Sequence, residues 1–559
     1  MRDRVQRASA PDGPPLALSE EDDDVQAAFA SLERFACRAY LEKPEAEAEP
    51  GDDAARALLQ RLGRKATAEA GRQLLVAVGV WSAHENLELI RLRVPTRFSE
   101  ELQEAAAAIE ASPPVDADEA RRRNLSHLLA LAIDESSTVE VDDAMSVEPL
   151  DDGRMRLWVH IADATRYVAK GSPLELEARE RSTSRYLPTG TISMFPMSLA
   201  AGPLSLREGV TSCALSFGLC LDADGGLDGS ETPIVTPSFV RATRLTYLEV
   251  DRLLEGPIEP SADAAADAAA AAAADDEATA DEATVDVLRR LEYLAAQRLE
   301  WRVAGGSMEG IAPDGLPDMS VKAYEQPEAP GGWAVEVTVG GARAGGVARR
   351  IVSEAMIVAG EAAARYGATH SVPLPFRAQS VREELSDEQI ADCPEGPARA
   401  WLAIRQMKAS YVTHAPELHE GLGLEAYVQA TSPIRRHADL SVHYQLKAHL
   451  RGEPLPYPPD DAGEHQKSEI IRLARAAASS PLRGLERSAN AYWLAEFLKR
   501  NGGKPLRALV LGSDARQRDT FKLLLLDLGA IVDCTSSRPL GLGDELEVAP
   551  NRLGELEVA

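Results

Sequence analysis

The sequence lacks three features that would each place it in a particular class of protein. Its five cysteines are scattered and form no C-x-x-C pair, so neither a zinc site nor a disulfide framework is indicated. No apolar run reaches the roughly 20 residues of a membrane span. The segment from Met1 to Arg7 has arginines but no apolar stretch behind them, so it is not a secretory signal. We therefore expect a protein of a reducing compartment that is neither secreted nor held in a membrane.

Positive charge is also scarce. The chain has 89 Asp and Glu against 60 Lys and Arg, a formal net charge of −29, which argues against a protein that coats nucleic acid non-specifically. Much of the acidic excess lies in residues 20–24 and 260–286, whereas Lys and Arg outnumber Asp and Glu between Arg435 and Arg507. The sequence is therefore compatible with a basic lining inside an acidic protein.

The N-terminal part divides into two segments. At 559 residues the chain is long enough for about three or four domains. Residues 1–24 read as a disordered acidic terminus, and a transit peptide upstream of Met1 is compatible with this pattern. Residues 25–115 read as helices followed by a short strand-like run at Leu87–Leu92, which suits a winged-helix-like module. Packing explains the apolar positions there about as well as nucleic-acid binding does.

The rest of the chain reads as one large domain and a small barrel. Residues 116–490 have the mixed periodicity of an α/β (α+β) domain, interrupted at 261–284 by a low-complexity insert of Ala, Asp and Glu. Residues 491–559 contain five short strand-like runs, which fit an OB-type β-barrel, a fold that commonly binds single-stranded nucleic acid. The strands expected in the large domain are Arg154–Val168, Ser212–Leu221 and Ala334–Val339, and the helices are Asp286–Arg302 and Val347–Tyr366.

Carboxylates are unusually dense between Ile133 and Met145. The five acids lie between two apolar runs, at Asp134, Glu135, Glu140, Asp142 and Asp143. Acids this close repel one another, so the folded state needs a cation or raised pKa values. Hard divalent cations with oxygen ligands are the usual solution. An acidic surface loop or an acidic calcium-binding or protein-binding module remains an alternative, although the spacing does not fit an EF-hand loop.

A second informative stretch runs from Thr431 to Leu440. Ser432 suits a helix N-cap and Pro433 suits the first helical position, so we predict a helix that begins there. Arg435 and Arg436 in its first turn would oppose the helix dipole. A phosphate held at the helix N-terminus would explain them, and surface ion pairs, for example with Asp439, are the alternative.

Together these stretches resemble the ribonuclease II / ribonuclease R (RNB) family of processive 3′→5′ exoribonucleases, in its chloroplast and cyanobacterial branch. The resemblance covers roughly two-thirds of the chain, in the order found in the family. It rests on Ala132-Ile133-Asp134, Glu140-Val141-Asp142-Asp143, His160-Ile161-Ala162-Asp163, Thr183-Ser184-Arg185-Tyr186-Leu187-Pro188, Glu354-Ala355-Met356 and Thr431-Ser432-Pro433-Ile434-Arg435-Arg436 with Asp439 and His443.

The resemblance implies a magnesium-dependent active site, with manganese as a substitute. Asp134, Glu140 and Asp143 would hold Mg²⁺, Asp142 would be the carboxylate most directly needed for hydrolysis, and Arg435 would clamp the scissile phosphate. Glu140 departs from the Asp that is usual in the family. One extra methylene moves a ligand by about 1 Å, so a catalytically weakened or silent RNA-binding protein of the same fold remains the alternative function.

The resemblance also implies contacts to RNA. Tyr186 would stack near the 3′-terminal nucleotide and help to set the size of the last product, and Tyr247 and Glu354 would contact the terminal ribose. Arg436 and, less directly, Glu486 would add contacts. A second stacking aromatic should lie between Met308 and Val339. Without the resemblance, Tyr186 would read as a half-buried tyrosine at a strand end.

Glu354 also has a plainer interpretation. It shares one helix face with Glu361, and Arg350 and Arg365 are spaced to pair with these acids, so the residues alone predict a solvated surface. With the resemblance, we expect single-stranded RNA as the partner, no stable binding of DNA, a monomer, and a location in the chloroplast stroma or the bacterial cytoplasm.

Overall fold

The computed structural model describes residues 23–38, 52–255, 282–311, 315–339, 346–459, 468–513, 519–551 and 553–558. Nearly all of the acidic terminus 1–24 and of the insert 261–284 lies outside these residues. The chain forms two compact units, one of residues 1–97 and 481–489 and one of residues 98–480 and 490–559. Among the described residues, no helix is long and apolar enough to cross a membrane.

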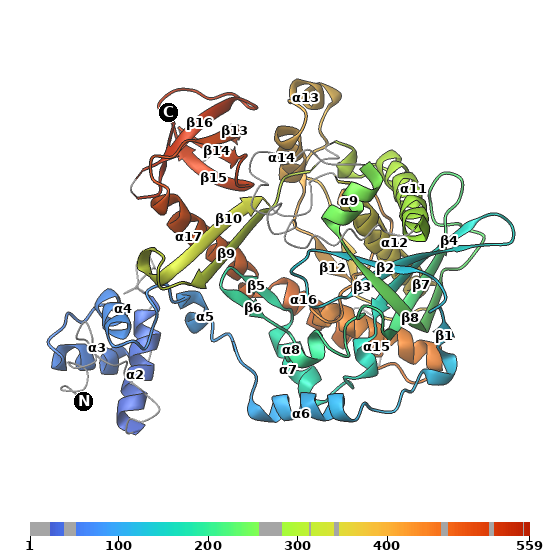
Figure 1. Ribbon diagram of the computed structural model, residues 1–559, viewed down its shortest axis with the longest axis horizontal. Helices are drawn as coiled ribbons and strands as arrows, with labels where there is room; N and C mark the ends of the chain where they lie inside the picture. Colours follow the sequence, from blue (N-terminus) through green and yellow to red (C-terminus); the bar gives the residue numbers. More distant parts are fainter. Residues whose placement is uncertain are drawn as a thin grey trace. The chain divides into compact units, whose positions relative to one another are not determined.

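The first unit is built from short amphipathic helices (Figure 1). Its core buries Phe29, Leu32, Leu59 and Leu74. The helices are α2 (Asp23–Ala36), α3 (Asp52–Arg61), α4 (Ala68–Ala77) and α5 (Leu87–Arg91).

The helical character predicted for this unit is confirmed, but the strand predicted at Leu87–Leu92 is wrong. Asn86 caps a helix there, because its side-chain oxygen accepts hydrogen bonds from the amides of Glu88 and Leu89. Such a cap satisfies donors that a strand would leave free. No strand occurs among the described residues of the first unit.

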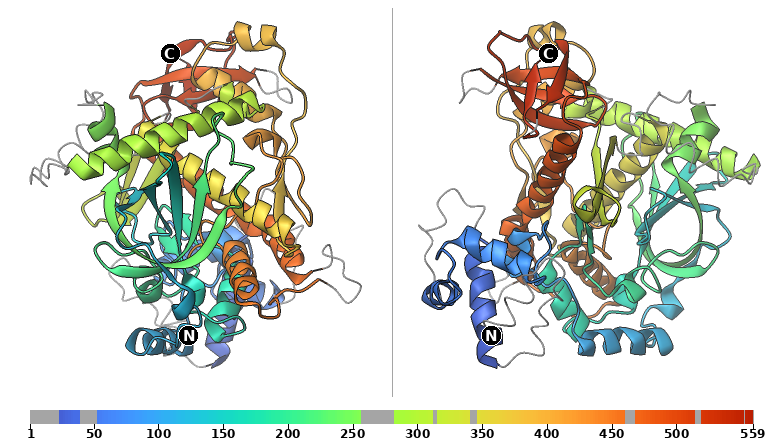
Figure 2. Two further views of the ribbon diagram at one scale, coloured as in Figure 1. Left: turned by 90° about the vertical axis from the view of Figure 1, so that its right-hand side faces the viewer. Right: turned by 60° about the vertical axis from the view of Figure 1, so that its left-hand side comes forward.

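The second unit is organised around a six-stranded mixed sheet in the order β1-β8-β2-β3-β4-β7. Because β7 also pairs with β8, five of the strands close into a ring, which is visible in Figure 2. The strands are β1 (Arg123–Asn124), β2 (Ala130–Asp134), β3 (Asp143–Pro149), β4 (Met155–Ala162), β7 (Thr211–Cys220) and β8 (Ile234–Thr246).

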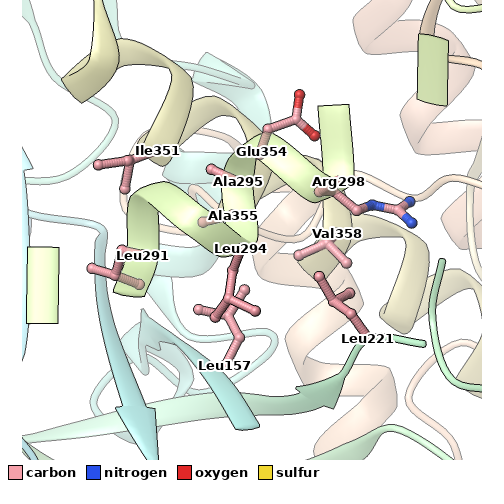
Figure 3. Close-up of a pocket in the computed structure, with 10 residues that line it drawn as sticks. All are labelled: Leu157, Leu221, Leu291, Leu294, Ala295, Arg298, Ile351, Glu354, Ala355 and Val358. Atoms are coloured by element: carbon pink, nitrogen blue, oxygen red, sulfur yellow. The ribbon is translucent and has the colours of Figure 1, made fainter. Parts of the chain in front are cut away.

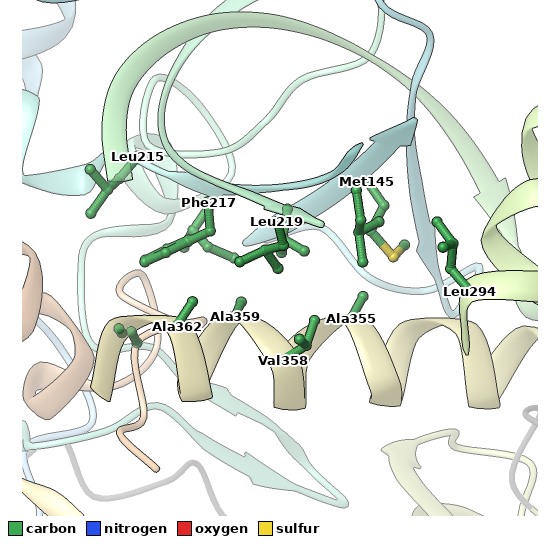
Figure 4. Close-up of a cluster of buried hydrophobic side chains, with 14 of the residues drawn as sticks. Met145, Leu215, Phe217, Leu219, Leu294, Ala355, Val358, Ala359 and Ala362 are labelled. Carbon is green, nitrogen blue, oxygen red and sulfur yellow. The ribbon is translucent and has the colours of Figure 1, made fainter. Parts of the chain in front are cut away.

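Two long helices, α11 (Glu282–Ala304) and α12 (Val347–Thr369), lie beside this sheet. Helix α12 presents Ala355, Val358, Ala359 and Ala362 to strand residues such as Phe217 (Figure 4). Small side chains let a helix approach a sheet closely, and this burial is the main source of stability in such a layer. The strands and helices predicted for this region are confirmed to within a few residues at each end, except that β4 ends six residues before Val168.

Shorter elements complete the second unit. Its helices are α6 (Glu100–Ala111), α7 (Pro173–Arg181), α8 (Met197–Ala200), α9 (Tyr247–Glu255), α13 (Asp387–Asp392), α14 (Pro397–Gln406), α15 (His437–Arg451) and α16 (Glu469–Ala478). Its two-stranded sheets are β5 (Arg185–Leu187) with β6 (Gly190–Ile192), β9 (Met319–Glu325) with β10 (Trp333–Val339), and β11 (Phe376–Ala378) with β12 (Tyr411–Thr413).

The C-terminal part confirms the five predicted strands. They form an antiparallel sheet in the order β15-β14-β13-β16-β17, preceded by helix α17 (Leu485–Arg500). The two outer strands approach each other, since the Cys534 thiol lies 3.4 Å from the Leu556 carbonyl oxygen, as in an OB-like partial barrel. The bounds are β13 (Leu506–Ser513), β14 (Thr520–Leu525), β15 (Ala530–Thr535), β16 (Glu545–Pro550) and β17 (Leu556–Val558).

Candidate active site

Two neighbouring antiparallel strands bring the first acids together. Asp134 is the last residue of β2 and Asp143 is the first residue of β3, and the pairing of Leu131 with Met145 puts these ends side by side. Burial raises the pKa of Asp143 to about 8, and the charges of Asp134 and Asp142 add to the effect. Burial also raises the pKa of Asp134, against the opposing charges of Arg244 and Arg435. The pair therefore carries strong repulsion when both acids are ionised.

Asp142 faces a loop from a distant part of the chain. One of its oxygens accepts a hydrogen bond from the Ile434 amide at 3.0 Å, and the other accepts one from Arg435 Nε at 3.2 Å. Burial raises the pKa of Asp142 to about 7, although both partners favour its ionised form. Asp142 and Arg435, which the resemblance assigns to one active site, are therefore in contact.

Helix α15 begins later than the sequence predicts. Ser432 and Pro433 do not open it; the helix begins at His437, with Arg436 at the N-cap position. The chain before it is pinned instead by tertiary hydrogen bonds, in which Thr183 Oγ1 and the Ser184 amide both donate to the Arg435 carbonyl. These bonds hold the segment in a turn that local propensity does not encode.

Arg435 and Arg436 end up in different environments. The Arg435 side chain is 41% exposed and is directed at Asp142. Arg436 is tied to Asp439 at 2.7 Å and to the Ser432 hydroxyl at 3.0 Å. The ion-pair alternative therefore describes Arg436, whereas Arg435 remains accessible to an anion.

Two tyrosines lie near the acids. Tyr186, on β5, is 47% exposed, and its hydroxyl donates to Glu140 at 3.3 Å. Tyr247 opens α9. Burial raises the pKa of Tyr247, and the charges of Asp143 and Asp134 raise it further.

Glu140 is held differently from the other acids. The Ser193 hydroxyl donates to one of its oxygens at 2.6 Å, while Tyr186 donates to the other. No sequence pattern points to Ser193, because a serine at the end of a short hairpin has no distinctive signal.

Glu354 lies in the interior. It accepts a hydrogen bond from Arg302 Nε at 2.9 Å and is 2% exposed, and Glu361 is likewise buried, against Arg298. The surface interpretation of this helix face is therefore wrong, because α11 covers it with two arginines. Figure 3 shows Glu354 and Arg298 beside a cavity lined mainly by apolar side chains. Its volume of about 10 Å³ suits a single water at most.

The remaining predicted RNA contacts are Glu486 and an aromatic residue between Met308 and Val339. Glu486 lies in the first turn of α17, within the residues assigned to the first unit. Between Met308 and Val339 the aromatic residues are Tyr324 and Trp333. Trp333 packs on Trp493, and Tyr324 is 45% exposed. The Ala323 amide donates to the Pro188 carbonyl, so the strand of Tyr324 runs along the end of the hairpin that carries Tyr186.

A buried ion network lies at the end of β4. Asp163 accepts hydrogen bonds from Lys447 at 2.6 Å and from Arg122 at 2.8 Å. Burial opposes ionisation of Asp163, but these two cations hold its pKa well below the usual range. The network joins β4 to α15 and so helps to place the loop that carries Arg435.

The acids can be compared with the needs of a divalent cation. Among the described residues, no three His, Cys, Asp or Glu side chains converge as in a preformed metal centre. Magnesium, however, usually binds to one or two carboxylates and keeps several waters. Asp134 and Asp143 satisfy that requirement, and a cation would relieve their mutual repulsion. The donor set therefore fits Mg²⁺.

Carboxylates that can hold a divalent cation, facing an arginine that can hold a phosphate, are the parts of a metal-dependent phosphodiesterase or nuclease site. The family models agree with this class. Residues 122–452 match the RNB domain and residues 2–87 match the double HTH domain of ribonuclease II. The chain belongs to the RNB family of exoribonucleases, in the branch with chloroplast and cyanobacterial members.

Relatives support that placement. An uncharacterised ribonuclease of Synechocystis is 38% identical over 495 residues, which are 88% of this chain and 67% of that protein. The chloroplastic/mitochondrial ribonuclease II of Arabidopsis thaliana is 34% identical over 540 residues, which are 96% of this chain and 61% of that protein. The chain thus spans about two-thirds or less of the length of these relatives.

The fold has a counterpart of known structure. Mycoplasma genitalium RNase R, solved in complex with ribose-methylated single-stranded RNA, superimposes with a TM-score of 0.64. The match has 18% sequence identity and covers 84% of this chain and 76% of that protein. It establishes the fold alone.

Proposed function

We propose that this protein is a processive 3′→5′ exoribonuclease that hydrolyses single-stranded RNA to nucleoside 5′-monophosphates. The observation that carries the proposal is the contact of Arg435 with Asp142 beside the pair Asp134 and Asp143. It brings phosphate-binding and cation-binding groups to one place from positions about 290 residues apart. An acidic calcium-binding surface would not need the arginine.

In this proposal each residue has a defined task. Asp134 and Asp143 would hold Mg²⁺, or Mn²⁺ in its place, which when bound would supply an activated water and charge stabilisation for the leaving oxygen. Arg435 binds the scissile phosphate through its planar guanidinium. Asp142 orients Arg435 and accepts a proton of the attacking water.

The nucleotide contacts follow from exposure and position. The exposed face of Tyr186 stacks on the terminal base, with Tyr324 as the second stacking surface, since bases stack on aromatic rings without regard to sequence. Tyr247 donates to the terminal ribose and favours RNA over DNA. A ribose contact of Glu354 does not follow from its position, because Glu354 is buried and bonded to Arg302. Arg436 adds a contact to the RNA, and Glu486, in the first unit, adds one of its own. We infer a monomer that works in an organelle or in the bacterial cytoplasm.

The proposal is tested with 5′-labelled single-stranded RNA and magnesium. The native protein is expected to shorten the labelled RNA stepwise and to release mononucleotides, and EDTA should abolish this activity. Asp142→Asn should lose the activity, whereas Asp152→Asn, a change of an exposed acid in a turn, should retain it. A DNA strand of the same sequence should be neither bound stably nor shortened.

The same assay separates the alternative of a silent RNA-binding protein. In that case the native protein would bind the RNA with a salt-dependent affinity and leave it intact with magnesium present. Glu140→Asp is then the informative variant, because it restores the residue usual in the family.

A further inference from the structure

Each oxygen of the Glu140 carboxylate accepts a hydrogen bond from within the protein. Glu140 is 8% exposed, and a buried carboxylate must find hydrogen-bond donors. Ser193 donates to one oxygen at 2.6 Å, and Tyr186 donates to the other at 3.3 Å. Both donors are neutral hydroxyl groups, and both come from outside the acidic stretch.

Both donors belong to one segment, residues 183–193, which includes the β5–β6 hairpin. The same segment holds Arg435, through the bonds of Thr183 Oγ1 at 2.8 Å and of the Ser184 amide at 2.9 Å to the Arg435 carbonyl. Glu140 therefore fastens the β5–β6 hairpin to the acidic loop. This hairpin carries Tyr186, and the segment that includes it also supports Arg435.

Asp134 and Asp143 differ from Glu140 in this respect. In the described part of the chain, neither accepts a hydrogen bond from a side chain or forms an ion pair, and each is only partly buried. Their oxygens are free for a cation and its waters. The three acids predicted as metal ligands thus divide into a pair with open oxygens and one residue whose oxygens are occupied.

We propose that Glu140 is a positioning residue, which fixes the ring of Tyr186 and the hairpin behind Arg435, and that it is not a ligand of the metal. The inference rests on the proposed function for the roles of Tyr186 and Arg435. The length of the side chain explains the choice of residue. An aspartate at 140 would be shorter by one C–C bond, about 1.5 Å, and would not span the gap to both Ser193 and Tyr186.

Metal binding without RNA is the first test, measured as Mn²⁺ affinity by electron paramagnetic resonance. Asp143→Asn should weaken it at least about tenfold, since even an outer partner of a ligand contributes 10- to 100-fold to metal affinity. Glu140→Gln should leave the Mn²⁺ affinity within about twofold of the native value, well short of the 10- to 100-fold loss expected for a ligand or its partner. An equal loss in both variants would overturn the inference.

The second test measures the length of RNA at which shortening stops, together with KM and kcat. Ser193→Ala is the decisive variant, because it keeps the Glu140 carboxylate but removes its strongest partner. It should change the final length and raise KM by about two- to tenfold, the effect of one hydrogen bond, with the Mn²⁺ affinity unchanged. Tyr186→Phe and Glu140→Gln should change the final length in the same direction. Thr191→Ser, in the same hairpin, is the control.

The outcomes separate the two proposals. A native protein that leaves RNA intact would remove the proposed function, while the Mn²⁺ titration still decides whether Glu140 is a ligand. If the native protein shortens RNA and Ser193→Ala leaves the final length and KM as in Thr191→Ser, the positioning role is wrong. If Glu140→Gln does not fold, as judged by circular dichroism, Ser193→Ala alone decides.

Discussion

Arg435 Nε lies 3.2 Å from Asp142 Oδ2, although 293 positions separate the two residues in the sequence. The adjacent amide of Ile434 donates to the other oxygen of the same carboxylate. One buried acid thus fixes both the backbone and the side chain of the arginine loop. In the proposed function, this contact positions the guanidinium before any phosphate arrives.

Replacement of Arg435 by lysine tests that geometry. Lysine keeps the positive charge but loses the planar fork, and removal of one preorganised donor from a site of developing charge costs about 100-fold or more in rate. We expect a loss of that order in the initial rate of mononucleotide release. Arg290→Lys changes an arginine that pairs with Asp286 on an exposed helix surface, and it should leave the rate unchanged. An equal loss of rate in this control would mean that the effect is not specific to Arg435.

Removal of the Tyr186 ring should weaken RNA binding directly. Stacking of a base on an aromatic side chain contributes about 1–3 kcal/mol, so Tyr186→Ala should raise the Kd for single-stranded RNA at least about fivefold. Fluorescence anisotropy in EDTA measures binding without degradation. Tyr293→Ala removes a tyrosine that is 54% exposed on α11 and serves as the matched control, with an expected Kd equal to that of the native protein.

The Asp163 network predicts a dependence of stability on pH. Lys447 and Arg122 depress the pKa of Asp163 in the folded state against the effect of burial, so its stabilisation is present above the unfolded pKa, about 3.9, and is lost as the pH falls towards the folded pKa. Asp163→Asn should lower the free energy of unfolding by about 3–5 kcal/mol at pH 7, and the difference should shrink below about pH 4.

Urea denaturation at pH 7 and at pH 3 measures this difference in the free energy of unfolding. A difference between native protein and Asp163→Asn that is the same at pH 7 and pH 3 would contradict the assignment of an ionised Asp163.

Gly360 tests the close packing of α12. A Cβ at this position would lie 2.7 Å from the Val428 carbonyl oxygen and against the ring of Tyr427. Overpacking of this kind costs about 1–3 kcal/mol, so Gly360→Ala should lower the free energy of unfolding by that amount. At Gly229 a Cβ would meet nothing within 4 Å, and Gly229→Ala should have no comparable cost. Thermal denaturation of both variants makes the comparison.

Several elements could be predicted because their signals are local. Alternation of apolar and polar residues marked the five C-terminal strands, and helical periodicity marked α11 and α12. The helix predicted at Ser432 failed because Asp439 and Thr183 hold the preceding turn by tertiary hydrogen bonds. The prediction that Glu354 and Glu361 lie on a solvated surface was wrong. Charge spacing along one helix does not reveal a second helix whose arginines cover it.

The sequence by itself determined the class of the protein, since runs of acids and the arginine motif are legible as residue types in a fixed order. The tertiary structure alone decided how the acids are used. Asp142 meets Arg435, Asp134 and Asp143 keep open oxygens, and Glu140 is occupied by Ser193 and Tyr186. The reason is physical: a carboxylate acquires its role from the donors and charges that folding brings within about 3 Å of it, and those donors come from distant positions in the chain.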